Sequence, residues 1–319
     1  MNIRPVFNES DQRKLSIISF SLFSAWLLSF PFEGQVLYAL VKKTNIDEAA
    51  LVLTAICLHF VGLIITGFCV KRQDAAKVTM IASSVACLAG SLVFFLPYSS
   101  LWYIAIAAMA LFAGLFIASW GYYFKMYSEP EQRLQTAAGV LICSNVAMIV
   151  INVITVNISA FWGLSLSILS LVASLLLTFR LESRSDEPLT NLGLFPQELP
   201  LILKPLILLC LFIFIITINS GLMYQVVTPA FAHHQFLASY YWAIPYIAAL
   251  LILKKLPAKV NRAYILYVAM TMIGLSYILF MQLDRSVVSY LIIDTLMLGA
   301  FGVCDLFWWS ILGNVLDYS

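Results

Sequence analysis

Apolar runs of about 20 residues recur along the whole chain and constrain its fold more than any other feature. Of the 319 residues 62% are hydrophobic and only 11% are charged, against roughly 25% charged in an ordinary soluble domain. Hydrocarbon offers no hydrogen bonds to a bare peptide group, so runs of this length must be helices rather than barrel strands, which are half as long. The sequence therefore predicts an all-α, polytopic membrane helix bundle.

One polar stretch divides the predicted helices into two sets. Six precede Arg180–Pro200, the longest polar segment inside the chain, and four follow it. We predict a six-helix bundle over 1–179, a linker over 180–200 and a four-helix bundle over 201–319. The ten predicted helices are Leu15–Leu40, Ala49–Val70, Lys77–Leu96, Leu101–Phe124, Leu134–Val156, Ile158–Phe179, Leu201–Gln225, Phe236–Leu253, Ala263–Leu283 and Val287–Leu316.

Basic residues are distributed asymmetrically between the two sides of this predicted bundle. All of the 18 Lys and Arg residues except Lys42, Lys43 and Arg285 lie at the amino terminus or after even-numbered helices. Because Lys and Arg are retained in cytoplasmic loops, this asymmetry sets the orientation. The sequence predicts a multi-pass protein of the cell membrane whose amino terminus and 180–200 linker are cytoplasmic.

A carboxylate stands near the end of the first apolar run, in the stretch SFPFEGQ. Glu33 lies between Pro31 and Gly34, in the outer half of the predicted first helix. Proline removes a backbone donor and glycine loosens the helix, so we predict a break that leaves polar backbone beside the carboxylate, as at transporter binding sites. The alternative is a helix that ends near Phe30, with Glu33 at the outer interface.

Two further carboxylates, Asp294 and Asp305, fall in the last predicted helix, where an ionised group costs several kcal/mol. Their separation of eleven residues is three turns plus about 20° of rotation, which places both on one face, about 17 Å apart along the axis. Both are candidates to line one path for a solute or a proton. For Asp305 the alternative is an interfacial position at the inner membrane surface.

Five other side chains in apolar runs are candidates with structural alternatives. Asn219 is a candidate cavity residue, and interhelical hydrogen bonding is its alternative. Asn145 and Asn152 share a helical face, which suits either a cavity or packing against neighbouring helices. His59 is a secondary cavity candidate whose alternative is a hydrogen-bonded core position. Trp120 is a secondary candidate that also fits an interfacial aromatic belt.

Enzyme chemistry finds no support in the sequence. It contains no Walker loop, no HExxH, no GxSxG and no His and carboxylate cluster at metal spacing, so we expect neither an enzyme nor a cofactor or metal. The six cysteines lie singly in or beside apolar runs without CxxC spacing, which is typical of small core residues.

Six helices, a polar link and a second helix set resemble the major facilitator superfamily, in which two six-helix halves enclose a central cavity. The resemblance covers nearly the whole chain, with the second half incomplete. That family carries a Gly-x-Leu-Ala-Asp-Arg-x-Gly-Arg-Lys signature after its second helix, and the counterpart here is GFCVKRQDAAK, in which Gly67 and Arg72 match. Lys71 replaces the acidic residue and Asp74 the second glycine, which argues against the gating interactions attributed to that loop.

The resemblance implies that helices one, four, seven and ten line the cavity. These helices carry Glu33, Asn219, Asp294 and Asp305. It implies a transporter whose partners are the lipid bilayer and a small solute, with protons coupled through Glu33 or Asp294.

Two stretches, FPFEGQVLYAL and GVCDLFWWSILGNVLDYS, look like the membrane portions of LuxR-type transcriptional regulators, whose transporter-like domain precedes a helix-turn-helix. No basic, helix-turn-helix-like segment occurs within these residues, so DNA binding would belong to a domain beyond Ser319. On this alternative the chain is a fragment and its membrane bundle senses a ligand.

Overall fold

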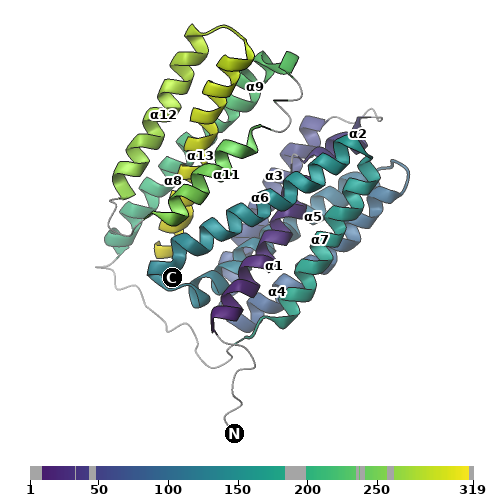
Figure 1. The fold of residues 1–319 in the computed structure, drawn as a ribbon. Coiled ribbons are helices and arrows are strands. Elements are labelled where there is room, and N and C mark those ends of the chain that lie inside the picture. The colour runs from purple at the N-terminus through teal and green to yellow at the C-terminus, as the bar shows by residue number, and fades with distance from the viewer. Residues whose placement is uncertain are drawn as a thin grey trace. The chain divides into compact units, whose positions relative to one another are not determined.

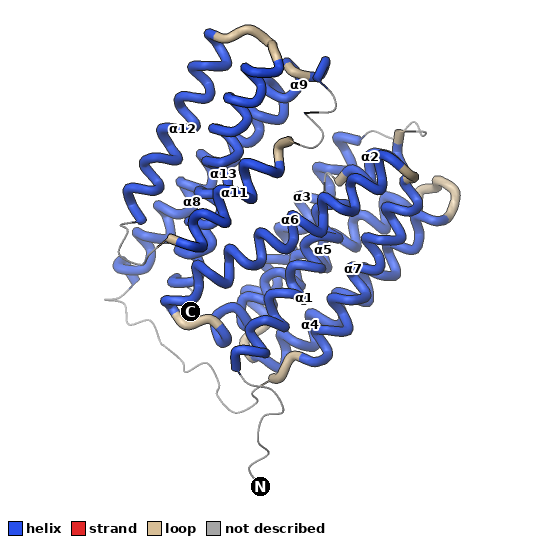
Figure 2. The backbone as a smooth tube through the Cα atoms, viewed as in Figure 1, coloured by secondary structure: helices blue, strands red, loops and turns tan. Residues whose placement is uncertain are grey.

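A computed structural model describes residues 9–32, 34–42, 48–183, 199–234, 237, 241–256 and 262–315. Every regular element in these ranges is helical (Figures 1 and 2). Eight helical segments among them are long and apolar enough to cross a membrane. The predicted all-α, multi-pass character is therefore confirmed, whereas the predicted count of ten spans is not reached.

The helices form two compact units. Unit 1 is Met1–Glu129 with Cys143–Asn191, and unit 2 is Pro130–Ile142 with Leu192–Ser319. The helices up to the linker are α1 (Glu9–Ser29), α2 (Gln35–Val41), α3 (Glu48–Cys69), α4 (Gln73–Leu92), α5 (Leu101–Tyr127), α6 (Arg133–Asn157) and α7 (Ala160–Arg180). Those after it are α8 (Leu199–Leu222), α9 (Thr228–Ala230), α11 (Ala243–Lys255), α12 (Arg262–Gln282) and α13 (Val287–Val315).

The first predicted helix is interrupted at the place that Pro31 and Gly34 indicated. α1 ends at Ser29, and α2 begins after Gly34, whose backbone is extended with φ −82° and ψ 150°. A Cβ on Gly34 would lie 2.0 Å from the carbonyl carbon of Ser29, so the chain turns back too closely for any other residue. The end of α1 at Ser29 also agrees with the alternative prediction, and Glu33 itself lies outside the described residues.

The first and eighth predicted helices are the two without a qualifying span in the described ranges. α1 carries Asp11, Arg13 and Lys14 in its first turns and several serines beyond them. α11 has 13 residues, about 20 Å at 1.5 Å per residue, whereas the hydrocarbon layer is about 30 Å thick. Predicting spans from apolar runs alone overlooked both features.

The seventh predicted helix continues past its expected end at Gln225. α8 passes into a π-helical stretch, Met223–Val227, which leads directly into α9. Pro229 has no N–H to offer the carbonyl of Gln225, and a proline at this place favours a locally wider winding of the helix.

In unit 1 four helices close a ring. α1 packs on α7 and on α5, and α4 packs on the same two helices, while α3 packs on α5. Aromatic rings fill the ring of helices, with Phe23 of α1 stacked on Phe116 of α5 at 3.6 Å between centroids. The indole N–H of Trp26 on α1 donates to Ser91 Oγ on α4 at 3.0 Å. The core of unit 1 therefore holds both apolar packing and paired polar groups.

Serine and threonine hydroxyls hold α1 against α7. Ser19 Oγ lies 2.8 Å from Thr178 Oγ1, and Ser174 Oγ donates to the Ser19 carbonyl at 2.7 Å. Ser170 Oγ donates to the carbonyl of Leu22 at 2.8 Å. Small side chains at spacings of four allow such close approach between membrane helices. Ser19, one of the serines that lower the hydropathy of α1, thus faces α7.

α13 is the central helix of unit 2, in contact with α8, α11 and α12. Two glycines of α13 face α11. A Cβ on Gly302 would lie 2.9 Å from the carbonyl oxygen of Tyr246, and one on Gly299 would lie 3.9 Å from that of Pro245. The two helices therefore approach most closely around Gly302.

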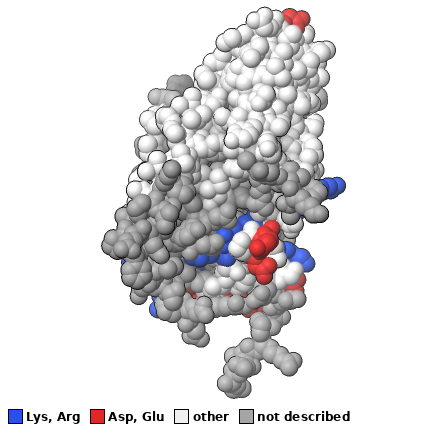
Figure 3. Space-filling view, turned by 90° about the vertical axis from the view of Figure 1, so that its left-hand side faces the viewer, with Lys and Arg blue, Asp and Glu red and all other residues white. Residues whose placement is uncertain are grey.

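Large apolar side chains cover much of the surface, the reverse of a water-soluble protein. Phe68 on α3 is 77% exposed and Met281 on α12 is 79% exposed. In Figure 3 the upper part of the face shown is largely white, so few Lys, Arg, Asp or Glu residues lie on that part of the described surface. An extended apolar surface of this kind fits contact with the lipid bilayer.

Glycines bring the backbones of α3 and α5 into direct contact. A Cβ on Gly62 of α3 would lie 2.2 Å from the carbonyl oxygen of Leu111, and one on Gly114 of α5 would lie 2.1 Å from that of His59. Gly67, further along α3, has nothing within 4 Å of its Cβ position. On α3, therefore, Gly62 is packed against a neighbouring backbone and Gly67 has open space at its Cβ position.

We expect Gly62→Ala and Gly114→Ala to lower the thermal midpoint of the purified protein, because the new methyl group must push two backbones apart. Overpacking of this kind costs roughly 1–3 kcal/mol. Gly67→Ala is the matched control and should leave the midpoint unchanged or raise it slightly, since alanine favours the helix. Thermal unfolding in detergent measures all three, and equal midpoints for Gly62→Ala and Gly67→Ala would contradict the packing described.

Candidate functional site

Asp294 is a buried carboxylate of α13. It belongs to the candidate membrane span Val287–Trp309 and is only 8% exposed. Its Oδ2 atom has no hydrogen-bond partner within the described part of the chain. The side chains around it in sequence, Ile293 and Met297, are at most 1% exposed. A polar group so placed is unfavourable unless it has a function or a partner from solution.

Asp305, eleven residues further along α13, is held by two other side chains. The hydroxyl of Tyr246 on α11 donates to Asp305 Oδ2 at 2.6 Å, and the side chain of Trp308 hydrogen-bonds the same carboxylate. The contact lies next to the close approach of α11 and α13 at Gly302. Interhelical hydrogen bonding therefore accounts for Asp305, whereas Asp294 has no such account.

Aromatic and hydroxyl groups surround the turn of α13 that carries Asp294. Tyr290, which is 3% exposed, lies one turn earlier on the same face. Its ring centroid is 5.2 Å from that of Phe231 and 6.2 Å from that of Tyr241. The Tyr241 hydroxyl lies 2.7 Å from Oγ1 of Thr295, the residue after Asp294. None of these residues was predicted from the sequence.

Arg285 lies in the turn between α12 and α13. Its guanidinium carbon is 4.0 Å from the centroid of the Phe280 ring and 5.5 Å from that of Phe231. Its Nη1 donates to the carbonyl of Phe280 at 2.7 Å and to that of Leu283 at 3.2 Å. Arginine at the end of a helix satisfies the last carbonyls in this way. Its charge is thus engaged by α12 and two aromatic rings.

Two histidines fix the same turn from the other side. Nε2 of His233 lies 2.8 Å from the Arg285 carbonyl oxygen, and Nε2 of His234 lies 3.0 Å from it. Asp284, beside Arg285, accepts hydrogen bonds from the hydroxyls of Ser289 and Ser286, which hold the pKa of this exposed carboxyl below its usual value. The α12–α13 turn is therefore rigidly connected to the segment after α9.

The Asn219 side chain bonds its own helix, whereas His59 bonds a neighbouring helix. The Asn219 amide donates to the carbonyl of Ile215 in its own helix at 2.8 Å, while its backbone carbonyl accepts from Tyr277 of α12 at 2.9 Å. His59 hydrogen-bonds the backbone of Ala110, and its Nδ1 is buried with no partner in the described ranges. The link between α8 and α12 thus uses the backbone of Asn219 and not its amide.

Asn145 and Asn152 lie on α6, the first buried and the second half-buried. Oδ1 of Asn152 has no hydrogen-bond partner among the residues that the structure describes. Trp120 is 1% exposed, donates to Ser16 Oγ at 2.9 Å and stacks on Phe20 at 3.8 Å. It is a packing residue of the unit 1 core rather than part of a surface belt.

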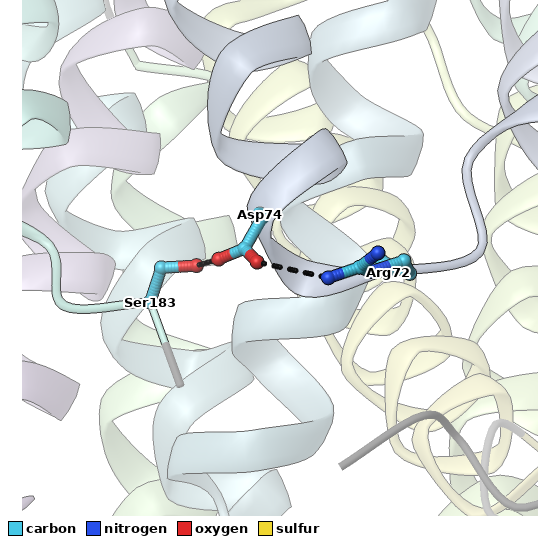
Figure 4. Close-up of polar contacts among 3 residues, drawn as sticks. All are labelled: Arg72, Asp74 and Ser183. Atoms are coloured by element: carbon cyan, nitrogen blue, oxygen red, sulfur yellow. Dashed lines mark hydrogen bonds and ion pairs between the residues drawn. The ribbon is translucent and has the colours of Figure 1, made fainter. Parts of the chain in front are cut away.

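The loop after α3 is bound to the end of α7 within unit 1. Asp74 accepts a hydrogen bond from Ser183 Oγ and lies 3.5 Å from Arg72 Nη2 (Figure 4). The Tyr122 hydroxyl of α5 donates to the carbonyl of Val70. Asp74, which stands where the family signature has glycine, is therefore engaged inside its own unit.

Three further side chains hold the residues that follow α7. Gln73 Nε2 and the Tyr127 hydroxyl donate to the Glu182 carbonyl at 3.3 and 3.0 Å, and Gln12 Oε1 accepts from the Glu182 N–H at 3.1 Å. Lys77 Nζ donates to the carbonyl of Leu181. Helices α1, α4 and α5 thus fix the chain as far as Ser183.

The primary candidates are placed differently by the structure. Asp294 and Asp305 share α13, and Asn219 lies on α8, which packs on α13. The polar contacts of these three residues differ, and no hydrogen bond within the described ranges joins them. Glu33 lies outside the described residues. A single constellation of all four is therefore still a prediction.

The chain matches no protein-family model, and a comparison with curated proteins finds no significant relative. The part of the chain that the structure describes contains no group of three or more His, Cys, Asp or Glu side chains positioned to hold a metal ion. Individual side chains, Asp294 above all, are therefore the features that point to a function.

We expect Tyr246→Phe to destabilise the protein, because it removes the hydroxyl that ties α11 to Asp305. Interhelical hydrogen bonds in membranes contribute about 0.6 kcal/mol on average and up to roughly 1.7 kcal/mol. Tyr267→Phe on α12 is the matched control, since Tyr267 is 65% exposed and should tolerate the change. Unfolding in a denaturing detergent series measures both variants. Equal stability of the two would contradict a stabilising hydrogen bond between Tyr246 and Asp305.

Proposed function

We propose that this chain is a transporter-like integral membrane protein that binds a small solute in a central cavity and couples its movement to protons. Eight candidate membrane spans support the membrane location, and polar side chains within apolar helices support a path through the bundle. On this proposal the protein lies in the cell membrane with its amino terminus in the cytoplasm, as the distribution of Lys and Arg indicates.

The single observation that carries the proposal is the buried Oδ2 atom of Asp294, which has no hydrogen-bond partner among the described residues. A proton is the species that neutralises this carboxylate without needing space among buried neighbours. Loading and release of that proton changes the charge of a group inside the membrane, and a conformation that exposes the group to water favours the ionised form. Protonation thereby shifts the balance between two conformations, which is what coupling requires.

The test compares Asp294→Asn with Asp305→Asn in purified full-length protein. Dicyclohexylcarbodiimide modifies protonated carboxyl groups in apolar surroundings, so we expect it to label Asp294 in the wild type, as located by peptide mass spectrometry. Asp294→Asn should abolish proton-driven uptake in proteoliposomes while leaving thermal stability unchanged or higher, since an unsatisfied carboxylate is removed. Asp305→Asn should lower stability, because Asp305 is held by Tyr246.

Retention of proton-driven uptake in Asp294→Asn would overturn the assignment of this residue. So would the absence of carbodiimide label from Asp294 in a wild-type sample that is folded and labelled elsewhere.

A second function, ligand sensing, is favoured by the α3–α4 loop. Lys71 and Asp74 depart from the transporter signature, and Asp74 is bound to Ser183 and Arg72 inside unit 1, so it is not free for a gating contact elsewhere. On this alternative, ligand binding shifts a conformational equilibrium that a LuxR-type DNA-binding domain beyond residue 319 reads.

The two functions make opposite predictions about the coding sequence and about transport. For a sensor we expect two further helices and a helix-turn-helix in frame after codon 319, together with solute binding that is never followed by uptake. An immediate stop codon would exclude the sensor alternative.

A further inference from the structure

Three residues stand between Asp294 and the end of unit 2 that carries the α12–α13 turn. Tyr290 lies one turn from Asp294 toward that end, Phe231 packs on Tyr290 at 5.2 Å, and Arg285 lies 5.5 Å from the Phe231 ring. Phe231 is fully buried and Tyr290 is 3% exposed. The three side chains therefore form a continuous row of packing contacts on the side of Asp294 that faces this turn, with the Phe231 and Tyr290 rings tilted by 57° to each other.

Contacts on both sides hold these three side chains in place. Arg285 is pinned by the Phe280 ring at 4.0 Å and by the Phe280 carbonyl at 2.7 Å. The Arg285 carbonyl is held by His233 and His234, which follow Phe231 in the chain. These contacts leave Phe231 little freedom to leave its place while the turn remains intact.

Two physical effects make these packed side chains a barrier to water and protons. Packed aromatic rings exclude the water molecules along which a proton would travel. A fixed guanidinium at the mouth also repels cations, as arginines do in pores that exclude protons.

We propose that Phe231, Tyr290 and Arg285 form an aromatic seal that closes Asp294 off from water at the α12–α13 end of unit 2. The inference deepens the proposed function, since it assigns the side on which the proton site is shut in this conformation. Proton exchange from that side requires the seal to open.

The test measures access to position 294 directly. In Asp294→Cys, a charged methanethiosulfonate reagent should react slowly, and the extent is read from the peptide that contains residue 294 by mass spectrometry. Adding Phe231→Ala should raise the rate by about tenfold, the factor that loss of roughly 1.4 kcal/mol of barrier gives. Adding Arg285→Gln should raise the rate for a cationic reagent more than for an anionic one.

Phe212→Ala is the matched control, because Phe212 of α8 packs on Phe307 at 6.4 Å, a different aromatic pair of unit 2. It should leave the rate unchanged. Equal acceleration by Phe231→Ala and Phe212→Ala, or rapid reaction in Asp294→Cys alone, would overturn the seal. Phe231→Leu, a milder change that should give a smaller increase, replaces Phe231→Ala if that variant does not fold.

The thiol reaction does not depend on whether Asp294 binds a proton. Failure of the seal would therefore appear as rapid thiol modification with normal dicyclohexylcarbodiimide labelling of the wild type. Failure of the proton site would appear as absent carbodiimide labelling with a slow thiol reaction.

Discussion

Hydrocarbon supplies neither donors nor acceptors, and several polar side chains of this chain meet that constraint by hydrogen-bonding between helices. In unit 1 the hydroxyls of Ser19, Ser174 and Thr178 hydrogen-bond between α1 and α7. The indole N–H of Trp26 on α1 donates to the hydroxyl of Ser91 on α4. In unit 2 the hydroxyl of Tyr246 on α11 donates to the carboxylate of Asp305 on α13. Each pairing joins two helices, so the groups that would be costliest to leave unpaired become the ones that position neighbouring helices.

Against this background an unpaired group carries more information than a paired one. Asp294 and Asp305 are the same residue type on the same helix, and their partners separate them. Asp305 has a hydroxyl and an indole, whereas one oxygen of Asp294 has no partner in the described ranges. We infer a function for Asp294 and a packing role for Asp305. Tyr290 lies one turn from Asp294 on the same helix, and Phe231 and Arg285 continue the packing from Tyr290 toward the α12–α13 turn.

The sequence predicted what depends on local patterns and missed what depends on helix rotation. Apolar runs located the helices, and Pro31 with Gly34 located the break between α1 and α2. The spacing of Asp294 and Asp305 predicted a shared face, but their different partners depend on α11, since Tyr246 lies 59 residues before Asp305. Counting apolar residues could not show that Ser19 of α1 faces α7, nor that α11 is short. The π-helical end of α8 has a signal in the sequence, because Pro229 follows it.

The glycine contact between α3 and α5 has a mechanical consequence. At Gly62 and Gly114 no side chain separates the two backbones, so there is nothing at the crossing that could change rotamer and let one helix slip past the other. Helices packed in this way move together as one rigid body. Any rearrangement that tilts α5 within unit 1 must carry α3 with it, and with α3 the loop that begins at Val70.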